Sequence, residues 1–280
     1  MTVAQLGLDG MPKRLFTATP TKLTTWLDCP KRYELTYIDK VPKGPPWAHN
    51  SLGLSVHNAL RDWFLLPVAE RTVDAAAAAV RGDWIDLGYR DAEQSAGWQE
   101  RATTMVTDYV RTLDPTDEPI GIERTVALRT QTLALSGRAD RIDVRSSVDG
   151  GEELVVVDYK TGRHLLSTDD ARSSLALAVY ARASERTLRR RCRKVELHHL
   201  PSGQVIAWEY DDGALERHLA RAEGIAAEIA ATEEFAPRPG VMCGYCDVVR
   251  ECESGRQELG GVMRAPWDVL ERWLADETGS

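Results

Sequence analysis

The sequence lacks the features that mark membrane-spanning and secreted proteins. No apolar run approaches the ~18 residues that a membrane-spanning helix requires. The N-terminus does not show the charged-then-apolar layout of a secretory signal. A G-x-x-x-x-G-K-[ST] phosphate loop is also missing, so the chain carries no P-loop helicase motor. These absences predict a cytoplasmic protein that does not bind membranes.

Positive charge is in the minority. The chain has 35 Lys and Arg against 43 Asp and Glu, a net charge of −8, which disfavours nucleic-acid binding through bulk electrostatics. Local clusters can still bind phosphate. One is the arginine-rich run 189–194, which a solvated helix end would explain equally well. The other lies near the start of the chain and comprises Lys13, Arg14, Lys22, Lys31 and Arg32.

Hydrophobic residues (43%) and charged residues (28%) occur in proportions typical of a folded globular protein. Residues 1–19 show no periodicity, which predicts a loose N-terminal arm. Residues 20–115 show helical periodicity almost throughout. We expect two short helices on either side of Pro30, because proline interrupts a helix, and longer helices at 51–66, 73–87 and 92–113.

From residue 116 the period of the apolar residues changes to two, which indicates strands. The β-branched run 154–157 is typical of a strand buried on both faces. Helices are predicted at 169–188 and 212–231, with a hairpin between them that turns at Pro201-Ser202-Gly203. Residues 116–236 are therefore expected to form an α/β core. Residues 237–280 carry three cysteines and a last helix near 266–275, and predict a separate C-terminal appendage.

Two aspartates occupy neighbouring predicted strands. Asp140 precedes the turn signal Asp149-Gly150-Gly151 and Asp158 follows it, and residue 149 is their midpoint. A hairpin closing there places the two aspartates opposite each other, with Cβ atoms about 4.5–5.5 Å apart. Like charges at that distance repel unless a divalent cation lies between them. Carboxylate ligands favour Mg²⁺ or Mn²⁺ over zinc.

Lys160 follows Asp158 by two residues and so lies on the same face of the strand. An ammonium at this place can orient a water nucleophile or stabilise charge that develops on a phosphate. A lone D-x-K tripeptide at a strand end is most often a surface ion pair. The buried strand that leads into Asp158 and the facing Asp140 favour a functional site instead.

The segments G-R-A-D-R-I-D and V-V-V-D-Y-K-T-G resemble motifs II and III of the PD-(D/E)XK nuclease superfamily, in its RecB-like branch. Residues 53–57, G-L-S-V-H, resemble the helical G-x-x-x-H motif of that family. The resemblance implies a restriction-endonuclease-like α/β core, with a mixed central sheet flanked by helices and a helical N-terminal region. The nuclease domain would span residues 20–236.

The same resemblance implies roles for individual residues. Asp140, Asp158, His57 and the Tyr159 carbonyl would hold Mg²⁺ or Mn²⁺, and Lys160 would position the nucleophile. Glu123 matches an acidic residue that the family often has before the hairpin. Tyr180 matches the tyrosine of the family's Q-x-x-x-Y motif and would help to hold DNA.

The sequence departs from that last motif, because Ala176 stands where the family has glutamine. Ser173 precedes it by three residues. We expect it on the same helix face, where its hydroxyl would supply the missing hydrogen bond.

Five cysteines are present, at positions 29, 192, 243, 246 and 252. The last three have the spacing C-x₂-C-x₅-C in a segment rich in proline and glycine, and Cys29 would complete a set of four. In a cytosolic protein such a set predicts a metal site rather than disulfides. Four cysteines alone fit either zinc or an iron–sulfur cluster.

The segments D-C-P-K-R-Y and C-G-Y-C resemble the two halves of the iron–sulfur site in AddB-type and CRISPR-adaptation nucleases. This resemblance implies a [4Fe–4S] cluster on Cys29, Cys243, Cys246 and Cys252, with zinc the less favoured occupant. The cluster would close residues 237–280 onto the N-terminal helices. Cys192 is expected to be an ordinary thiol.

Together these features predict a metal-dependent DNA nuclease of repair or recombination, a single-strand exonuclease acting at DNA ends beside a separate helicase. One alternative is a catalytically weak DNA-end-binding or scaffold subunit of a helicase–nuclease system, which Ala176 supports. The other is a CRISPR spacer-processing nuclease.

Overall fold

The computed structural model describes residues 15–147 and 150–278. Its centre is a sheet in which the strands follow the order β1-β3-β4-β5-β6, and β2 also pairs with β3. The β1–β3 and β4–β5 pairs are parallel and the other pairs are antiparallel. The strands are β1 (Phe16–Ala18), β2 (Gly121–Arg129), β3 (Leu133–Ser146), β4 (Glu152–Lys160), β5 (Cys192–His199) and β6 (Gln204–Glu209).

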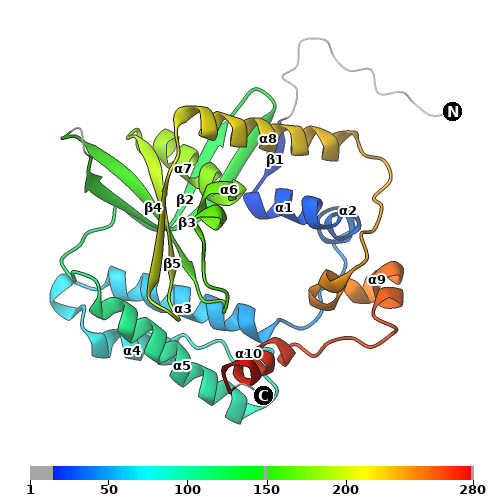
Figure 1. The fold of residues 1–280 in the computed structure, drawn as a ribbon, viewed down its shortest axis with the longest axis horizontal. Helices are drawn as coiled ribbons and strands as arrows, with labels where there is room; N and C mark the ends of the chain where they lie inside the picture. Colours follow the sequence, from blue (N-terminus) through cyan, green and yellow to red (C-terminus); the bar gives the residue numbers. More distant parts are fainter. Residues whose placement is uncertain (1–14, 148–149, 279–280) are drawn as a thin grey trace.

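Helices cover both faces of this sheet (Figure 1). One layer contains α3 (Ala48–Leu65), α4 (Val73–Gly82) and α5 (Ala92–Arg111), and the other contains α1 (Pro20–Asp28), α7 (Leu175–Leu188) and α8 (Asp212–Ala231). The remaining helices are α2 (Pro30–Tyr33), α6 (Thr168–Ser173), α9 (Glu253–Glu258), α10 (Asp268–Thr278), a π-helical turn (Glu34–Ile38) and three 3₁₀ turns (Val68–Glu70, Val241–Tyr245, Val249–Glu251).

Strand β4 lies between the two helical layers. Leu154 and Val156 pack toward α7, whereas Val155 and Val157 pack toward α3 and α5, and all four side chains are fully buried. The prediction of a strand buried on both faces is therefore confirmed. Its C-terminal end brings Asp158, Tyr159 and Lys160 to the level where α3 and α7 approach the sheet.

The β3–β4 hairpin has the register that the sequence predicts. Arg141 pairs with Val157 and Ile142 with Val156, and the same register continued by one step places Asp140 opposite Asp158. Of the predicted turn, Asp149 lies outside the described residues. Gly150 adopts a positive φ of 78°, a conformation that glycine accepts without strain.

Two predictions about the elements are wrong. The helix expected at 169–188 is broken at Ser174, whose ψ of 111° is not helical and whose hydroxyl accepts a hydrogen bond from the Leu177 amide. Ser174 thus acts as the N-cap of a new helix, α7. Within the segment expected to be a loose arm, β1 pairs with β3; residues 1–14 lie outside the described residues.

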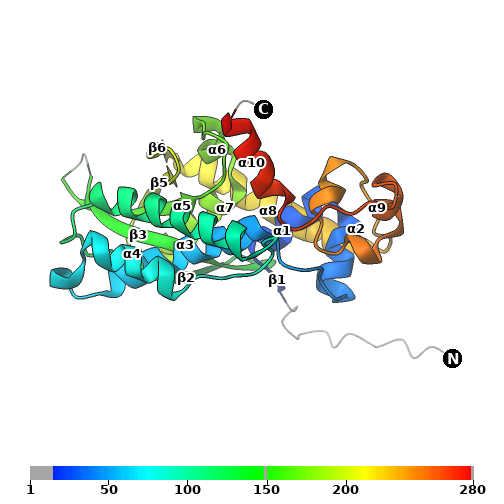
Figure 2. The same cartoon turned by 90° about the horizontal axis from the view of Figure 1, so that it is seen from below.

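The cysteine-bearing appendage packs against the N-terminal helices (Figure 2). The Asp247 carboxylate forms ion pairs with Arg32 at 3.2 Å and Lys43 at 3.0 Å, and the Gly44 amide donates to the Asp247 carbonyl at 2.7 Å. Just before the appendage, the Phe235 ring meets the Trp26 ring edge to face. Among the described residues, none of the helices has both the length and the apolar character needed to cross a membrane.

Candidate metal centre and active site

Three carboxylates form one row across three adjacent strands. In the β2–β3 ladder, Ile122 pairs with Arg141 and Arg124 with Ala139, so Glu123 stands opposite Asp140. The hairpin register adds Asp158 on the other side of Asp140.

The Glu123 backbone is unusual at this row, because its φ is +44° although it is not glycine. Such a conformation costs on the order of 1–3 kcal/mol and persists where the surrounding structure enforces it, often at functional sites. The pleat also reverses here: Ile122 packs toward the α3–α5 layer, whereas Val126 and Leu128 pack toward the opposite layer. This reversal aims the Glu123 carboxylate at its neighbours in the row.

His57 reaches the row from α3. Its Nδ1 atom lies 3.5 Å from Asp140 Oδ2 and 3.7 Å from Glu123 Oε1. Gly53 precedes it by one helical turn, and a Cβ atom there would lie 3.2 Å from the Thr161 hydroxyl. The glycine of the G-x-x-x-H motif therefore allows α3 to approach the segment that follows Lys160.

The surroundings of His57 are strongly negative. Burial alone would lower the pKa of His57, but hydrogen bonds to Asp140 and Glu123 outweigh burial and raise this pKa to about 10. The imidazole is therefore protonated at neutral pH, and it shares the compensation of the two carboxylates with Arg138, whose Nε lies 2.7 Å from Glu123 Oε2. A metal ion would supply the same compensation.

Asp158 and Lys160 form an ion pair at the end of β4. Burial raises the pKa of the Asp158 carboxyl, Asp140 raises it further, and the Lys160 ammonium opposes both effects. Burial would lower the pKa of Lys160, but the Asp158 carboxylate outweighs it and raises this pKa. Between them, the Tyr159 amide donates a hydrogen bond of 2.8 Å to Asp140 Oδ2, which orients that carboxylate.

Tyr180 lies on α7 directly over β3. A Cβ atom at Gly137 would come within 2.3 Å of the Tyr180 ring, so the glycine of G-R-A-D is required for this ring to reach its place. Burial raises the pKa of Tyr180 to about 12, and Asp158, Asp140 and Glu123 contribute to the rise. The hydroxyl is therefore close enough to the carboxylate row to sense its charge.

The structure brings together only part of the predicted ligand set. The ligand atoms of His57, Glu123 and Asp140 lie within 4.8 Å of one another, so Glu123, which was not among the expected metal ligands, belongs to the closest group. Asp158 lies outside this group of three and contacts Lys160 instead.

The prediction for Ser173 is wrong. Ser173 ends α6, its hydroxyl donates to the Asp169 carbonyl at 2.7 Å, and it does not share a helix with Ala176. The hydrogen bond of the family glutamine is not supplied from this position.

The residues of the row fit a divalent metal ion of the Mg²⁺ class. One imidazole nitrogen and two largely buried carboxylates converge from α3, β2 and β3. Oxygen-rich sites with a nearby imidazole suit Mg²⁺ or Mn²⁺. The hydrogen bonds to Asp140 and Glu123 raise the pKa of His57, so the row favours a positive charge at this place.

All four predicted cluster cysteines line one cavity, between α1 and the appendage: Cys29, Cys243, Cys246 and Cys252. Within the described part of the chain, no three of their sulfurs lie within 4.8 Å of one another. Amides point at two sulfurs, since Arg238 N–H donates to Cys29 Sγ and Gly255 N–H to Cys252 Sγ, both at 3.4 Å. Cys192 is buried in the core, away from this set.

Sequence reasoning missed the side chains behind the row. Arg141, Tyr109 and His198 are buried polar residues that contact one another on the α5 side of the sheet. The signal available in the sequence was an arginine at a buried strand position, directly after Asp140.

Comparison with known proteins identifies the family. The family model described as the PD-(D/E)XK nuclease superfamily matches residues 17–253. A solved structure of a candidate exonuclease from Eubacterium rectale is similar, with a TM-score of 0.51 and 11% identity, covering 90% of this chain and 94% of that one. The protein SSO0001 gives a TM-score of 0.41 and 14% identity, covering 88% and 90%. No curated protein sequence matches significantly.

Proposed function

The chain belongs to the PD-(D/E)XK nuclease superfamily, and we propose that it is a metal-dependent DNA nuclease that hydrolyses phosphodiester bonds at the carboxylate row. The observation that carries this proposal is the convergence of His57, Glu123 and Asp140 within 4.8 Å of one another, beside the Asp158–Lys160 pair. These groups come from α3, β2, β3 and β4, so no single local interaction explains their meeting.

His57, Glu123 and Asp140 would hold Mg²⁺ or Mn²⁺, and Asp158 and the Tyr159 carbonyl would complete the ligand set. When bound, the metal activates water and stabilises the leaving oxygen. Lys160 acts as a charged group, because its raised pKa keeps it protonated, and it orients the nucleophile and neutralises charge on the phosphate. Tyr180 keeps its proton at neutral pH and can donate it in a hydrogen bond to DNA.

The proposed substrate is single-stranded DNA, attacked from an end. The RecB-like motifs support this assignment, and a structural neighbour is a candidate exonuclease. The role would lie in DNA repair or recombination. Because the chain has no P-loop motor, unwinding would come from a separate helicase.

We also propose a [4Fe–4S] cluster on Cys29, Cys243, Cys246 and Cys252. Support comes from their shared cavity and from the amides that point at two of the sulfurs. The cluster would fasten the appendage to the N-terminal helices across more than 200 residues of sequence. Its role in this proposal is structural.

A second candidate function is a DNA-end-binding subunit with weak catalysis. Ala176 favours it, because the family glutamine that contacts DNA is missing and Ser173 does not replace it. The paired carboxylates oppose it, since a binding module gains nothing from an Asp158 carboxyl whose pKa is raised by burial and by the neighbouring Asp140.

The test uses anaerobically purified protein, end-labelled single-stranded DNA and Mn²⁺. We expect wild type to release labelled mononucleotides or short products and Asp158→Ala to release none. A covalently closed single-stranded circle should resist cleavage if the enzyme needs an end. Equal products from both proteins, or none from either, would remove the nuclease proposal in favour of the binding subunit. Cleavage of the circle would refute only the exonuclease assignment.

A further inference from the structure

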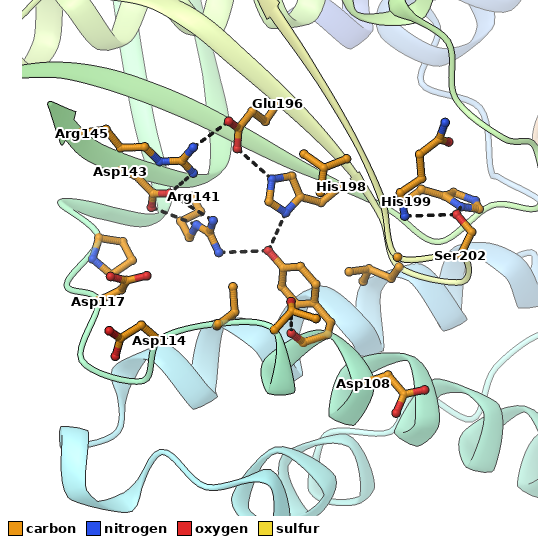
Figure 3. A pocket seen from close by; sticks show the side chains of 18 of the residues that line it. Asp108, Asp114, Asp117, Arg141, Asp143, Arg145, Glu196, His198, His199 and Ser202 are labelled. Carbon is orange, nitrogen blue, oxygen red and sulfur yellow. Dashed lines mark hydrogen bonds and ion pairs between the residues drawn. The ribbon is translucent and has the colours of Figure 1, made fainter. Parts of the chain in front are cut away.

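A closed ring of polar side chains lies behind the carboxylate row, on the face of the sheet that packs against α5 (Figure 3). It joins β3, β5 and α5. Its members, in order around the ring, are Arg141, Asp143, Arg145, Glu196, His198 and Tyr109.

The contacts on the β3 side of the ring are ion pairs. Arg141 holds both oxygens of Asp143, with Nε at 2.9 Å and Nη2 at 3.1 Å. Arg145 donates to Asp143 at 2.8 Å and to Glu196 at 2.6 Å. Two guanidinium groups therefore balance two carboxylates within the ring.

The remaining contacts run through Tyr109 and His198. Arg141 donates to the Tyr109 hydroxyl at 3.0 Å, and this hydroxyl lies 2.7 Å from His198 Nδ1. His198 Nε2 lies 3.0 Å from Glu196. A neutral His198 satisfies all three contacts, because Tyr109 donates to Nδ1 and Nε2–H donates to Glu196.

The ring forms one wall of a cavity of about 850 Å³. Its polar groups point at one another rather than outward, and each acceptor of the ring already has a donor. Arg141 Nε meets Asp143 only as an ion pair, but every link of the ring includes a hydrogen bond, and a connected network of this kind restrains the strands that carry it. The ring is therefore better suited to holding the strands in place than to binding a ligand in the cavity.

Two covalent neighbours link the ring to the carboxylate row. Arg141 directly follows Asp140, is only 4% exposed, and also donates to the Tyr159 hydroxyl at 3.4 Å. Tyr159 lies between Asp158 and Lys160, and its amide donates to Asp140 Oδ2 at 2.8 Å. Arg141 thus contacts β4 through the Tyr159 side chain, at the same position along the strand as the carboxylate row.

We propose that this ring positions the metal centre: through Arg141 and Tyr159 it fixes the Asp140 carboxylate and the Tyr159 carbonyl. Tyr109 is then a positioning residue, although it touches none of the expected metal ligands. Burying an arginine is costly unless all its partners are in place. The inference rests on the proposed function, because it assigns the ring to the metal site of that reaction.

Tyr109→Phe tests this role. The change keeps the packing of the aromatic side chain at position 109 and removes the hydroxyl that joins Arg141 to His198. We expect Mn²⁺ affinity, measured on protein without DNA by the electron paramagnetic resonance of free Mn²⁺, to fall about tenfold, the lower end of what outer partners of metal ligands contribute. At saturating Mn²⁺, kcat should stay reduced while KM for DNA is unchanged.

Tyr210→Phe is the matched control, since Tyr210 is also buried and its hydroxyl donates to the Ala171 carbonyl on the other side of the sheet. It should lose stability but keep Mn²⁺ affinity. If Tyr109→Phe does not fold, Tyr159→Phe is measured by the same criterion.

Suppose that wild type binds Mn²⁺ and cleaves DNA, and that the folded Tyr109→Phe variant binds Mn²⁺ as tightly as wild type. This result would overturn the positioning role and leave the proposed function standing. A wild type that neither binds Mn²⁺ nor cleaves DNA would overturn both.

Discussion

Replacing Gly137 by alanine should push Tyr180 away from the carboxylate row. The added Cβ would lie 2.3 Å from Tyr180 Cε1 and 3.1 Å from Cδ1, whereas carbon atoms in contact stay about 3.5–4.0 Å apart. The added Cβ atom is attached to the backbone of β3. The Tyr180 ring must therefore move away from this strand by more than about 1 Å. Overpacking of this kind destabilises by about 1–3 kcal/mol.

The steric origin of that loss can be isolated with Tyr180→Ala. Without the ring, alanine at 137 should be neutral or stabilising by about 0.5–1 kcal/mol, because glycine weakens a strand interior. The two changes should thus couple by about 1–4 kcal/mol in a double-mutant cycle, the difference between the two effects. Urea unfolding of the metal-free proteins measures it, with Gly151→Ala as control because nothing lies within 4 Å of its added Cβ. The placement of Tyr180 would be refuted if the two changes had additive effects on the free energy of unfolding, or if Gly137→Ala lowered this free energy no more than Gly151→Ala does.

Three further predictions concern charge, cysteine and DNA contacts. The His57 pKa is raised to about 10, so the stability that protonated His57 contributes to the metal-free protein is complete below pH 6.5 and lost as pH rises through about 10. In urea unfolding, His57→Ala should lack this decline of stability with pH. The same decline in wild type and variant would contradict the assignment to His57. Cys252→Ser should lose bound iron and the visible absorbance of the cluster, whereas Cys192→Ser should keep both; equal iron content in the two variants would count against the cysteine assignment. Ala176→Gln should lower the Kd for single-stranded DNA several-fold without changing Mn²⁺ affinity, and unchanged DNA binding in an anisotropy titration would argue against a DNA contact at this position.

The hairpin of β3 and β4 could be predicted because local rules determine it. A turn signal midway between Asp140 and Asp158 sets the register, and period-two alternation fixes the face of Lys160. The sequence marks both motif glycines, and the structure shows that they are points of close approach. Gly53 faces Thr161 and Gly137 faces Tyr180.

Other features depend on contacts between distant segments and leave little trace in the sequence. The break at Ser174 comes from a capping hydroxyl inside a segment with continuous helical periodicity. The place of Glu123 in the closest ligand group depends on a positive φ and a reversal of the pleat, which no composition signal announces. The ring around Arg141 joins α5 to β5 across about 90 residues, so only the folded chain reveals it.

The central claim is that His57, Glu123 and Asp140 hold the catalytic metal ion. Diffraction from crystals soaked in Mn²⁺, recorded at the manganese absorption edge, tests it most directly. The account predicts an anomalous peak at about 2.0–2.3 Å from the imidazole and from both carboxylates, which disappears in Asp140→Asn. A peak elsewhere, or none at these residues while the same protein cleaves DNA with Mn²⁺, would contradict it.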